Sequence, residues 1–219
     1  MRRFVIVGHN VDPEGDFALN DLCGGAGRLD VLLRCVSSAF FLSHGMRKEV
    51  EVFLVFPGQR SESTTGQPER GGHKTIRLCG RELRYLNPDE RSTGALVRTA
   101  LVKKLDGGAE KFSTPGIYVS RTDFDALVNT LPNPVWLVEN GEPWPSEGLP
   151  EDSTFFLSDH HDFTPREEEA LRLMGARKTS LGPSSLHSNH CITVVHWLMD
   201  RSAGARPPAD VPSPPVKDV

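Results

Sequence analysis

The segment at residues 180–191, SLGPSSLHSNHC, contains residue types that bind metals or act as nucleophiles. His187, His190 and Cys191 lie within five residues of one another, after a Leu-Gly-Pro turn. Histidine and cysteine are zinc ligands, and a cysteine beside a histidine can attack a carbonyl carbon. His196, the fourth ligand that a structural zinc site would need, lies about 140° further round a helix than Cys191. No CxxC pair supports zinc, and no oxyanion hole is evident for a nucleophile, so both interpretations are disfavoured.

The same segment can instead act through its backbone. Gly182 can adopt conformations that other residues cannot, and Pro183 fixes the next φ angle. A turn of this kind, after a short strand at 179–181, exposes N–H and C=O groups at the entrance of a helix. Those groups can bind the edge of an adenine between apolar side chains. The residues that could flank or complete such a pocket are Leu137, Ser158, Leu181 and Leu186.

Three further fragments are similar to motifs of the DHH phosphoesterases, which use carboxylates and histidines around metal ions. They are HNVDPEGD (9–16), GGHK (71–74) and SDHHDF (158–163). In this chain GGH precedes DHH instead of lying near the C-terminus, and the intervening aspartate motif is missing. Polar loops at strand ends are therefore the favoured interpretation, and manganese at Asp12, Asp16 and Asp159 is the alternative.

Composition is that of a globular protein with one well-buried core: 219 residues, 37% hydrophobic and 25% charged. No apolar run reaches the roughly 18 residues of a membrane span, and MRRFVIVGHN is better explained as a first strand than as a signal peptide. The four cysteines are scattered, which indicates reduced thiols and a cytoplasmic protein.

Charge is unevenly distributed along the chain. The net charge is −4, yet residues 60–84 carry six basic and three acidic side chains, whereas residues 139–169 carry ten acids and one base. A local basic surface can hold phosphates on an acidic protein, so the net charge does not exclude RNA.

Apolar spacing and turn residues predict alternating strands and helices, which is typical of an α/β fold. The expected elements are a strand at 3–7, a helix at 28–42, a strand at 50–56, a hairpin at 75–85, a helix at 94–105 capped by Ser92 or Thr93, an extended segment at 113–120, a helix near 122–130, buried parallel strands at 135–138 and 154–157, a helix opened by Thr164–Pro165 and a last helix from Cys191 to about Asp200. Residues 1–201 are predicted to be a single domain, and 202–219 a disordered, proline-rich tail.

Four stretches resemble one known family. GRLDVLLRCVSSAFFLSHGMRKEV (27–50), LNPDERST (86–93), STPGIYV (113–119) and SLGPSSLHSNHC (180–191) are similar in order and approximate spacing to the archaeal tRNA pseudouridine N1-methyltransferases of the TrmY family, members of the SPOUT superfamily. The resemblance covers about residues 1–200. It implies an α/β, SPOUT-type sheet with helices on both faces, a C-terminal trefoil knot, a homodimer, and S-adenosylmethionine (SAM) bound in the knot.

The resemblance also implies positions for the site residues, and it implies no metal. The cofactor contacts carried over by position are Leu137, Ser158, Leu181, Gly182, Pro183, Ser184, Ser185, Leu186 and Cys191. The family pattern has glycine at the position of Ser158, whose hydroxymethyl group can either crowd the cofactor or add a hydrogen bond. Cys191 would line the pocket through its sulfur and backbone. The arginines expected to contact RNA phosphates are Arg28, Arg34, Arg84 and Arg91.

The reaction implied is SAM-dependent N1-methylation of pseudouridine, at position 54 in the T-arm of tRNA. The N1–H is weakly acidic, so its loss should be assisted during transfer; solvent or a carboxylate such as Asp30 is conceivable as the base, and no catalytic residue is assigned. Two alternatives stay open: a metal-dependent DHH-like phosphoesterase, and a knotted RNA-binding dimer without activity, for which Ser158 would be the suspect substitution.

Overall fold

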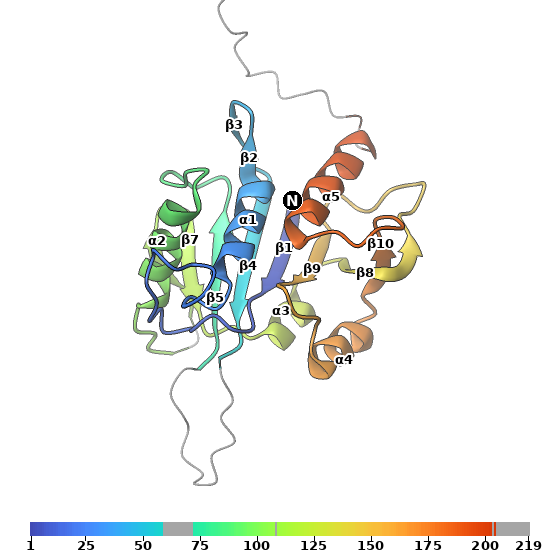
Figure 1. Ribbon diagram of the computed structural model, residues 1–219. Coiled ribbons are helices and arrows are strands. Elements are labelled where there is room, and N and C mark those ends of the chain that lie inside the picture. Colours follow the sequence, from blue (N-terminus) through green and yellow to red (C-terminus); the bar gives the residue numbers. More distant parts are fainter. Residues whose placement is uncertain (59–71, 108, 203, 205–219) are drawn as a thin grey trace, which may run out of the picture.

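A computed structural model describes residues 1–58, 72–107, 109–202 and 204, and its centre is an eight-stranded sheet (Figure 1). The strand order is β10-β8-β9-β1-β4-β5-β7-β6, and β2 and β3 form a separate hairpin. The strands are β1 (Arg2–Val7), β2 (Phe41–Leu42), β3 (Gly45–Met46), β4 (Val50–Phe56), β5 (Lys74–Cys79), β6 (Lys111–Thr114), β7 (Ile117–Ser120), β8 (Pro134–Pro143), β9 (Thr154–Ser158) and β10 (Arg177–Ser180). The helices are α1 (Leu29–Phe40), α2 (Glu90–Leu101), α3 (Phe124–Thr130), α4 (Pro165–Leu173) and α5 (Ser188–Ser202).

Helices cover both faces of this sheet. Successive strand residues point to opposite sides, and the strands are apolar on both sides, so each face packs against helices. In β1, Phe4 and Ile6 belong to the core cluster that also contains residues of α1, α2 and α5. Val5 and Val7 belong to the opposite cluster, with residues of α3 and α4. The predicted α/β class with helices on both faces is confirmed.

The sheet has a parallel half and an antiparallel half. β10, β8, β9, β1 and β4 are parallel, whereas β5, β7 and β6 continue the sheet with antiparallel pairs. The carboxyl ends of β8, β9 and β1 therefore open on the same side. In open α/β sheets this is the side on which ligands bind.

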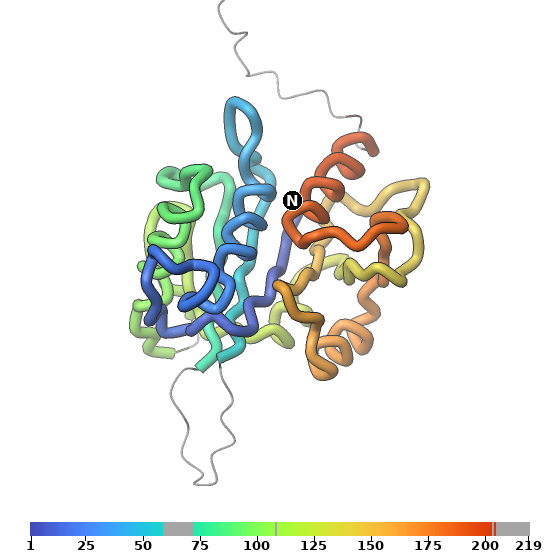
Figure 2. Tube along the Cα trace, in the orientation of Figure 1, coloured from blue at the N-terminus to red at the C-terminus, as the bar shows by residue number. Residues whose placement is uncertain are grey.

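β8 and β10 meet closely at an interruption of their register, which we call the crossing. Lys178 lies opposite Trp136, but the next residue, Thr179, lies opposite Glu142, so residues 137–141 leave the ladder as an excursion. After β10 the chain runs back from the sheet edge to α5, which packs against α1 (Figure 2). The trefoil knot predicted from the resemblance would involve these segments, and it stays a prediction.

Three sequence predictions are wrong in detail. The expected hairpin at 75–85 is only its first strand, β5, which pairs with β4 and β7; the chain after Gly80 turns away and buries Leu83. α2 begins at Glu90 and is capped by Asp89, whose carboxylate accepts the Ser92 N–H at 2.7 Å. α5 begins at Ser188, three residues earlier than expected. Contacts with distant segments accompany the first and third differences, whereas a local cap by Asp89 sets the start of α2.

The predicted proline-rich tail lies, apart from residues 202 and 204, outside the described residues. Within the described ranges, none of the helices is long and apolar enough to span a bilayer.

Candidate functional site

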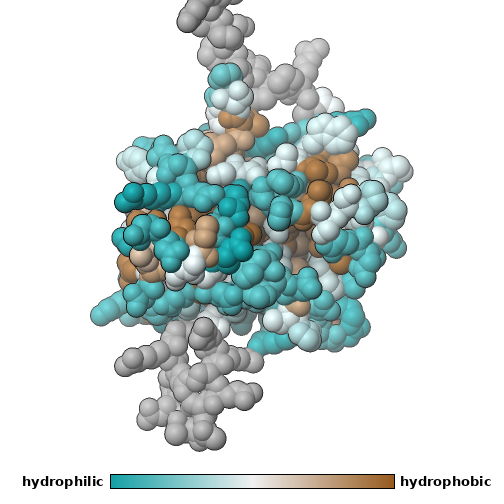
Figure 3. All heavy atoms as spheres, viewed as in Figure 1, coloured by the Kyte–Doolittle hydropathy of each residue, from teal (hydrophilic) through white to brown (hydrophobic). Residues whose placement is uncertain are grey.

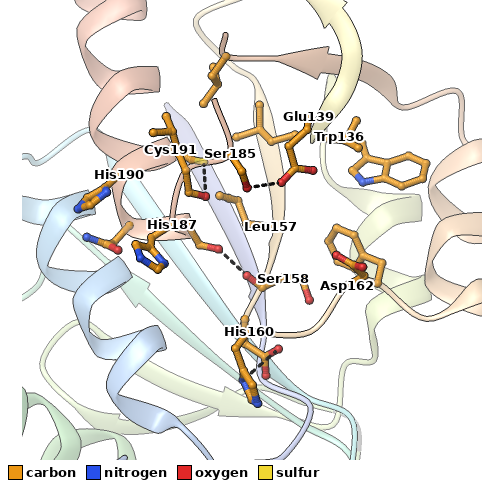
Figure 4. A pocket seen from close by; sticks show the side chains of 18 of the residues that line it. Trp136, Glu139, Leu157, Ser158, His160, Asp162, Ser185, His187, His190 and Cys191 are labelled. Carbon is orange, nitrogen blue, oxygen red and sulfur yellow. Dashed lines mark hydrogen bonds and ion pairs between the residues drawn. The ribbon is translucent and has the colours of Figure 1, made fainter. Parts of the chain in front are cut away.

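A pocket of about 930 Å³ opens at the carboxyl ends of β8 and β9, beside α1 and the first turn of α5 (Figure 4). Its walls come from the 137–141 excursion, the 158–163 loop after β9 and the segment 180–191. Its volume is within the usual range for small-molecule sites. The crossing of the chain thus forms a hollow large enough for a nucleoside-sized ligand.

Eight of the nine residues predicted to contact a cofactor line this single pocket. They are Leu137, Ser158, Leu181, Gly182, Ser184, Ser185, Leu186 and Cys191. Pro183 is not among the lining residues, although its neighbours on both sides are. The contacts themselves remain a prediction; what the structure adds is that these distant segments meet.

Short hydrogen bonds hold the segment after β10 in place. The Ser180 hydroxyl donates to the Gly182 carbonyl at 3.1 Å, and the Ser185 hydroxyl donates to Glu139 at 2.7 Å. At the start of α5, Ser188 Oγ donates to the carbonyl of Ser158 at 2.6 Å. Within the described part of the chain, the backbone N–H groups of Ser184, Ser185 and Leu186 donate no hydrogen bond. The loop is therefore tied at three points and keeps three adjacent donors available.

The side chain of Ser158 is an unusual feature of the pocket wall. Its Oγ is buried and has no hydrogen-bond partner among the described residues. A buried polar atom without a partner costs about 1–3 kcal/mol. A polar ligand atom within hydrogen-bond distance of this oxygen would remove that cost.

Cys191 is present as a thiol and not as a thiolate. Burial, together with the charge of Glu139, raises the pKa of Cys191 to about 11. Its sulfur lies 3.7 Å from the Leu186 carbonyl, to which the S–H donates (Figure 4). A protonated thiol is a poor nucleophile. This state agrees with the expectation that Cys191 lines the pocket without covalent chemistry.

The structure does not assemble the zinc set. His196 points into the core, where Nε2 lies 3.0 Å from the Ala39 carbonyl and Nδ1 lies 3.1 Å from an Arg2 nitrogen. Burial, aided by the positive charges of Arg47 and Arg2, lowers the pKa of His196 to about 3. His187 and His190 stay at the rim of the pocket. In the described ranges, no group of three or more histidine, cysteine or acidic side chains is arranged to hold a metal ion.

The fragments similar to DHH phosphoesterases are only partly brought together. His9 and Asp159 meet, whereas His73 bonds to the carbonyl of Arg121. Asp12 accepts the backbone N–H of Glu14 at 2.9 Å in its own turn. These residues therefore build loops and ion pairs in the described structure.

Two of the four predicted RNA-contacting arginines lie at the pocket. Arg28 and Arg34 line it, and both bond to the buried carboxylate of Asp30, at 3.0 and 2.6 Å. Burial alone would raise the pKa of Asp30, but the hydrogen bonds from these two arginines lower it. Asp30 is therefore a weak base that anchors two cations. Arg84 and Arg91 are exposed and lie outside the pocket.

Sequence reasoning missed several wall residues. Lys178 and Trp136 line the pocket and form a cation–π pair, with the ammonium nitrogen 4.0 Å from the ring centroid. Glu139, His160 and Asp162 also line it. Trp136 lies in an apolar run that predicts only a buried strand, and nothing in the local pattern distinguishes it from a core residue.

Fold and pocket together define the class of protein. The structure is similar to that of Archaeoglobus fulgidus Nep1 bound to S-adenosylhomocysteine, with a TM-score of 0.62 over 93% of this chain and 99% of that one. At 16% identity this likeness shows a shared fold, the SPOUT-type α/β fold.

The sequence then gives the family. Residues 1–203 match the model of a family of SAM-dependent RNA methyltransferases. Several relatives are named tRNA (pseudouridine(54)-N(1))-methyltransferase. The one from Methanocella arvoryzae is 44% identical over 92% of this chain and 100% of its own length. Those from Methanosarcina acetivorans and Haloferax volcanii are 46% and 43% identical, each over 94% of this chain, and they are covered over 94% and 100% of their own lengths. The chain belongs to this family of SAM-dependent RNA methyltransferases.

Proposed function

We propose that this chain transfers the methyl group of SAM to N1 of pseudouridine at position 54 of tRNA. The observation that carries the proposal is the extent of the likeness to relatives named for that reaction. The Methanosarcina acetivorans relative is 46% identical over 94% of this chain, a span long enough to include most of the pocket. Residues 1–201 would form one catalytic domain, and a tRNA substrate implies a cytoplasmic location.

The pocket residues fit SAM by their chemistry. Leu137, Leu157 and Leu181 offer apolar surface for the adenine faces, and the N–H groups at 184–186 offer donors for its edge or for the carboxylate. The unpartnered hydroxyl of Ser158 offers a further polar contact. When bound, SAM supplies a methyl group already activated by its sulfonium sulfur.

The contribution of the protein is then mainly one of position. A tied loop and a buried wall can hold the two reacting atoms in line, and positioning alone supplies a large part of a rate enhancement. The bonds from Arg28 and Arg34 make Asp30 a poor acceptor for the N1 proton. We infer that Asp30 orients the two arginines toward RNA phosphates.

The function is tested by incubating the purified protein with labelled SAM and a tRNA transcript that carries pseudouridine at position 54. Nucleoside mass spectrometry is expected to detect N1-methylpseudouridine with this transcript and none with a transcript that keeps uridine there. EDTA should leave the yield unchanged, which separates the reaction from a manganese-dependent phosphoesterase. Cofactor binding without any product would instead identify an inactive RNA-binding protein.

Removing the Ser158 hydroxyl is expected to weaken cofactor binding. Ser158→Ala keeps the Cβ and deletes the unpartnered oxygen, so the dissociation constant of S-adenosylhomocysteine should rise about fivefold, the effect of one hydrogen bond. Isothermal titration calorimetry measures this constant. Ser158→Gly, which also removes the Cβ, tests crowding: tighter binding by both variants would show that the hydroxymethyl group obstructs the pocket.

The pocket arginines are expected to act on RNA and not on the cofactor. Arg34→Gln removes a charge beside the pocket, so the KM for tRNA should rise about fivefold while the affinity for S-adenosylhomocysteine stays unchanged. Arg28→Gln should behave alike, and the salt dependence of RNA binding should become shallower. Arg172→Gln is the control, because this exposed arginine of α4 pairs only with Glu169 in the described structure. Equal KM values for all three variants would contradict the assignment.

We also propose that two copies of the chain associate through α5. The helix carries Trp197, which is 55% exposed, and apolar residues gather over α5 in the surface view (Figure 3). Leu42 of the neighbouring hairpin is 39% exposed. Sedimentation equilibrium measures the mass in solution; a dimer is expected, and its dissociation by Trp197→Glu would locate the interface.

A further inference from the structure

His9 lies just after β1, behind the wall of the pocket. Its Nδ1 is 3.2 Å from an Asp159 oxygen, and its Nε2 is 3.0 Å from a Glu167 oxygen. Its backbone N–H donates to the other oxygen of Asp159 at 2.8 Å. One residue therefore joins the end of β1, the loop after β9 and the first turn of α4.

The geometry requires a charged imidazole. Each ring nitrogen faces a carboxylate oxygen, and a histidine can donate from both nitrogens only when it is protonated. Burial alone would lower the pKa of His9, but the hydrogen bonds and charges of Asp159 and Glu167 raise it to about 9. Two other histidines lie on this side: the His161 ring is 6.2 Å from the His9 ring, and His160 Nδ1 is 3.6 Å from the Asp159 oxygen that faces His9. Asn10 bonds to both of them. His9 is thus a cation held between two anions at neutral pH.

Both anions are themselves built into the wall. The side chain of Asp159 is fully buried and also accepts the His161 N–H at 2.8 Å. Glu167 accepts the N–H and the hydroxyl of Thr164 at 2.8 and 2.9 Å, in the capping box that starts α4. The loop is fastened at its beginning and just beyond its end by the same imidazolium.

This loop forms one side of the pocket. Residues 158–163 all line it, whereas His9 does not (Figure 4). Ser158, which precedes Asp159 directly, carries the unpartnered hydroxyl. A change at His9 therefore reaches the pocket indirectly, through Asp159, Glu167 and the loop between them, which includes His161.

We propose that His9 is a positioning residue of the methyltransferase: by bridging Asp159 and Glu167, its imidazolium holds the 158–163 wall in the shape that binds the cofactor. Two of the fragments similar to DHH phosphoesterases, residues 9–16 and 158–163, would then serve this enzyme through an ion bridge in place of a metal. The inference rests on the proposed function only for measurements of tRNA methylation. Binding of S-adenosylhomocysteine is expected of any member of this SAM-dependent family, so it tests His9 independently of the RNA substrate.

The test compares His9→Gln with His73→Ala, which changes a half-buried histidine that does not line the pocket. Calorimetry at pH 7 is expected to show about tenfold weaker S-adenosylhomocysteine binding for His9→Gln, the effect of a loosened pocket wall, and no change for the control. Glu167→Gln, which removes one partner charge, should weaken binding in the same direction and serves if His9→Gln does not fold.

A pH series supplies a readout that a purely structural role would not move. Binding by the unchanged protein should weaken as the pH rises through 9, and the difference from His9→Gln should disappear there because both residues are then neutral. Equal affinity of the unchanged protein and both variants at pH 7 would overturn the proposal. Weaker cofactor binding by His9→Gln, together with no tRNA methylation in any sample, would refute the proposed function and leave the role of His9 intact.

Discussion

Replacing Gly141 by alanine is expected to remove most cofactor binding. Gly141 lies where the 137–141 excursion rejoins β8 against β10, and an added Cβ would lie 2.7 Å from the backbone carbon of Thr179 and 2.9 Å from the nitrogen of Ser180. These are backbone atoms of a paired strand, so they cannot swing aside as a flexible side chain could. The two crossing segments must separate, and both contribute to the pocket.

The expected cost is about 3 kcal/mol in the free energy of unfolding, at the upper end for overpacking. The dissociation constant of S-adenosylhomocysteine should rise about a hundredfold, since small misplacements in a site have effects of that size. Urea denaturation and calorimetry measure the two quantities. Gly45→Ala is the matched control, because nothing lies within 4 Å of a Cβ at that position. A Gly141→Ala protein that is as stable and binds as tightly as the unchanged one would refute the crossing.

The second large effect concerns stability at alkaline pH. The pKa of His9 is about 9 in the folded protein, against an ordinary value of 6.5. Because folding raises this pKa, the stabilisation is fully present below pH 6.5 and is lost as the pH rises through 9. A difference of this size corresponds to about 3 kcal/mol.

Urea denaturation at pH 6.5 and pH 9.5 measures this loss. The unchanged protein should lose about 3 kcal/mol more than His9→Gln over that interval, since glutamine cannot titrate. His73→Ala should follow the unchanged protein. Asp159 and Glu167 affect stability at low pH instead. Folding lowers their pKa values, so the stabilisation that they provide is lost when acid protonates them. Parallel pH curves for the unchanged protein and His9→Gln would show that His9 is not the titrating group.

The two predictions concern different walls of one pocket. Gly141 lets the chain pass close enough to itself to form the hollow, and His9 fastens the loop on the other side. Neither residue is predicted to touch the cofactor by its side chain. The site thus depends on packing and charge behind its surface as much as on the groups that line it.

The sequence by itself determined the local elements and the family. Apolar spacing predicted α1 and β9, because such spacing follows from the geometry of a helix or strand. Compact apolar runs predicted that β8 and β9 are buried parallel strands, and the structure adds that they pair with each other. Thr164 and Pro165 marked the start of α4, where Thr164 caps the helix in a capping box with Glu167 and Pro165 is the first helical residue. Resemblance placed eight predicted cofactor residues that the structure brings into one pocket.

Only the tertiary structure decided the contacts between distant segments. His9 and Asp159 are 150 positions apart, and residues of their types suit a metal site, a hydrogen-bond network or an ion pair equally well. The unpartnered hydroxyl of Ser158 and the close approach at Gly141 likewise depend on neighbours that no local spacing specifies. Periodicity reports which face of an element is buried. The partner that each face and each charge meets is set by how the elements pack, and that partner determines the chemistry of the residue.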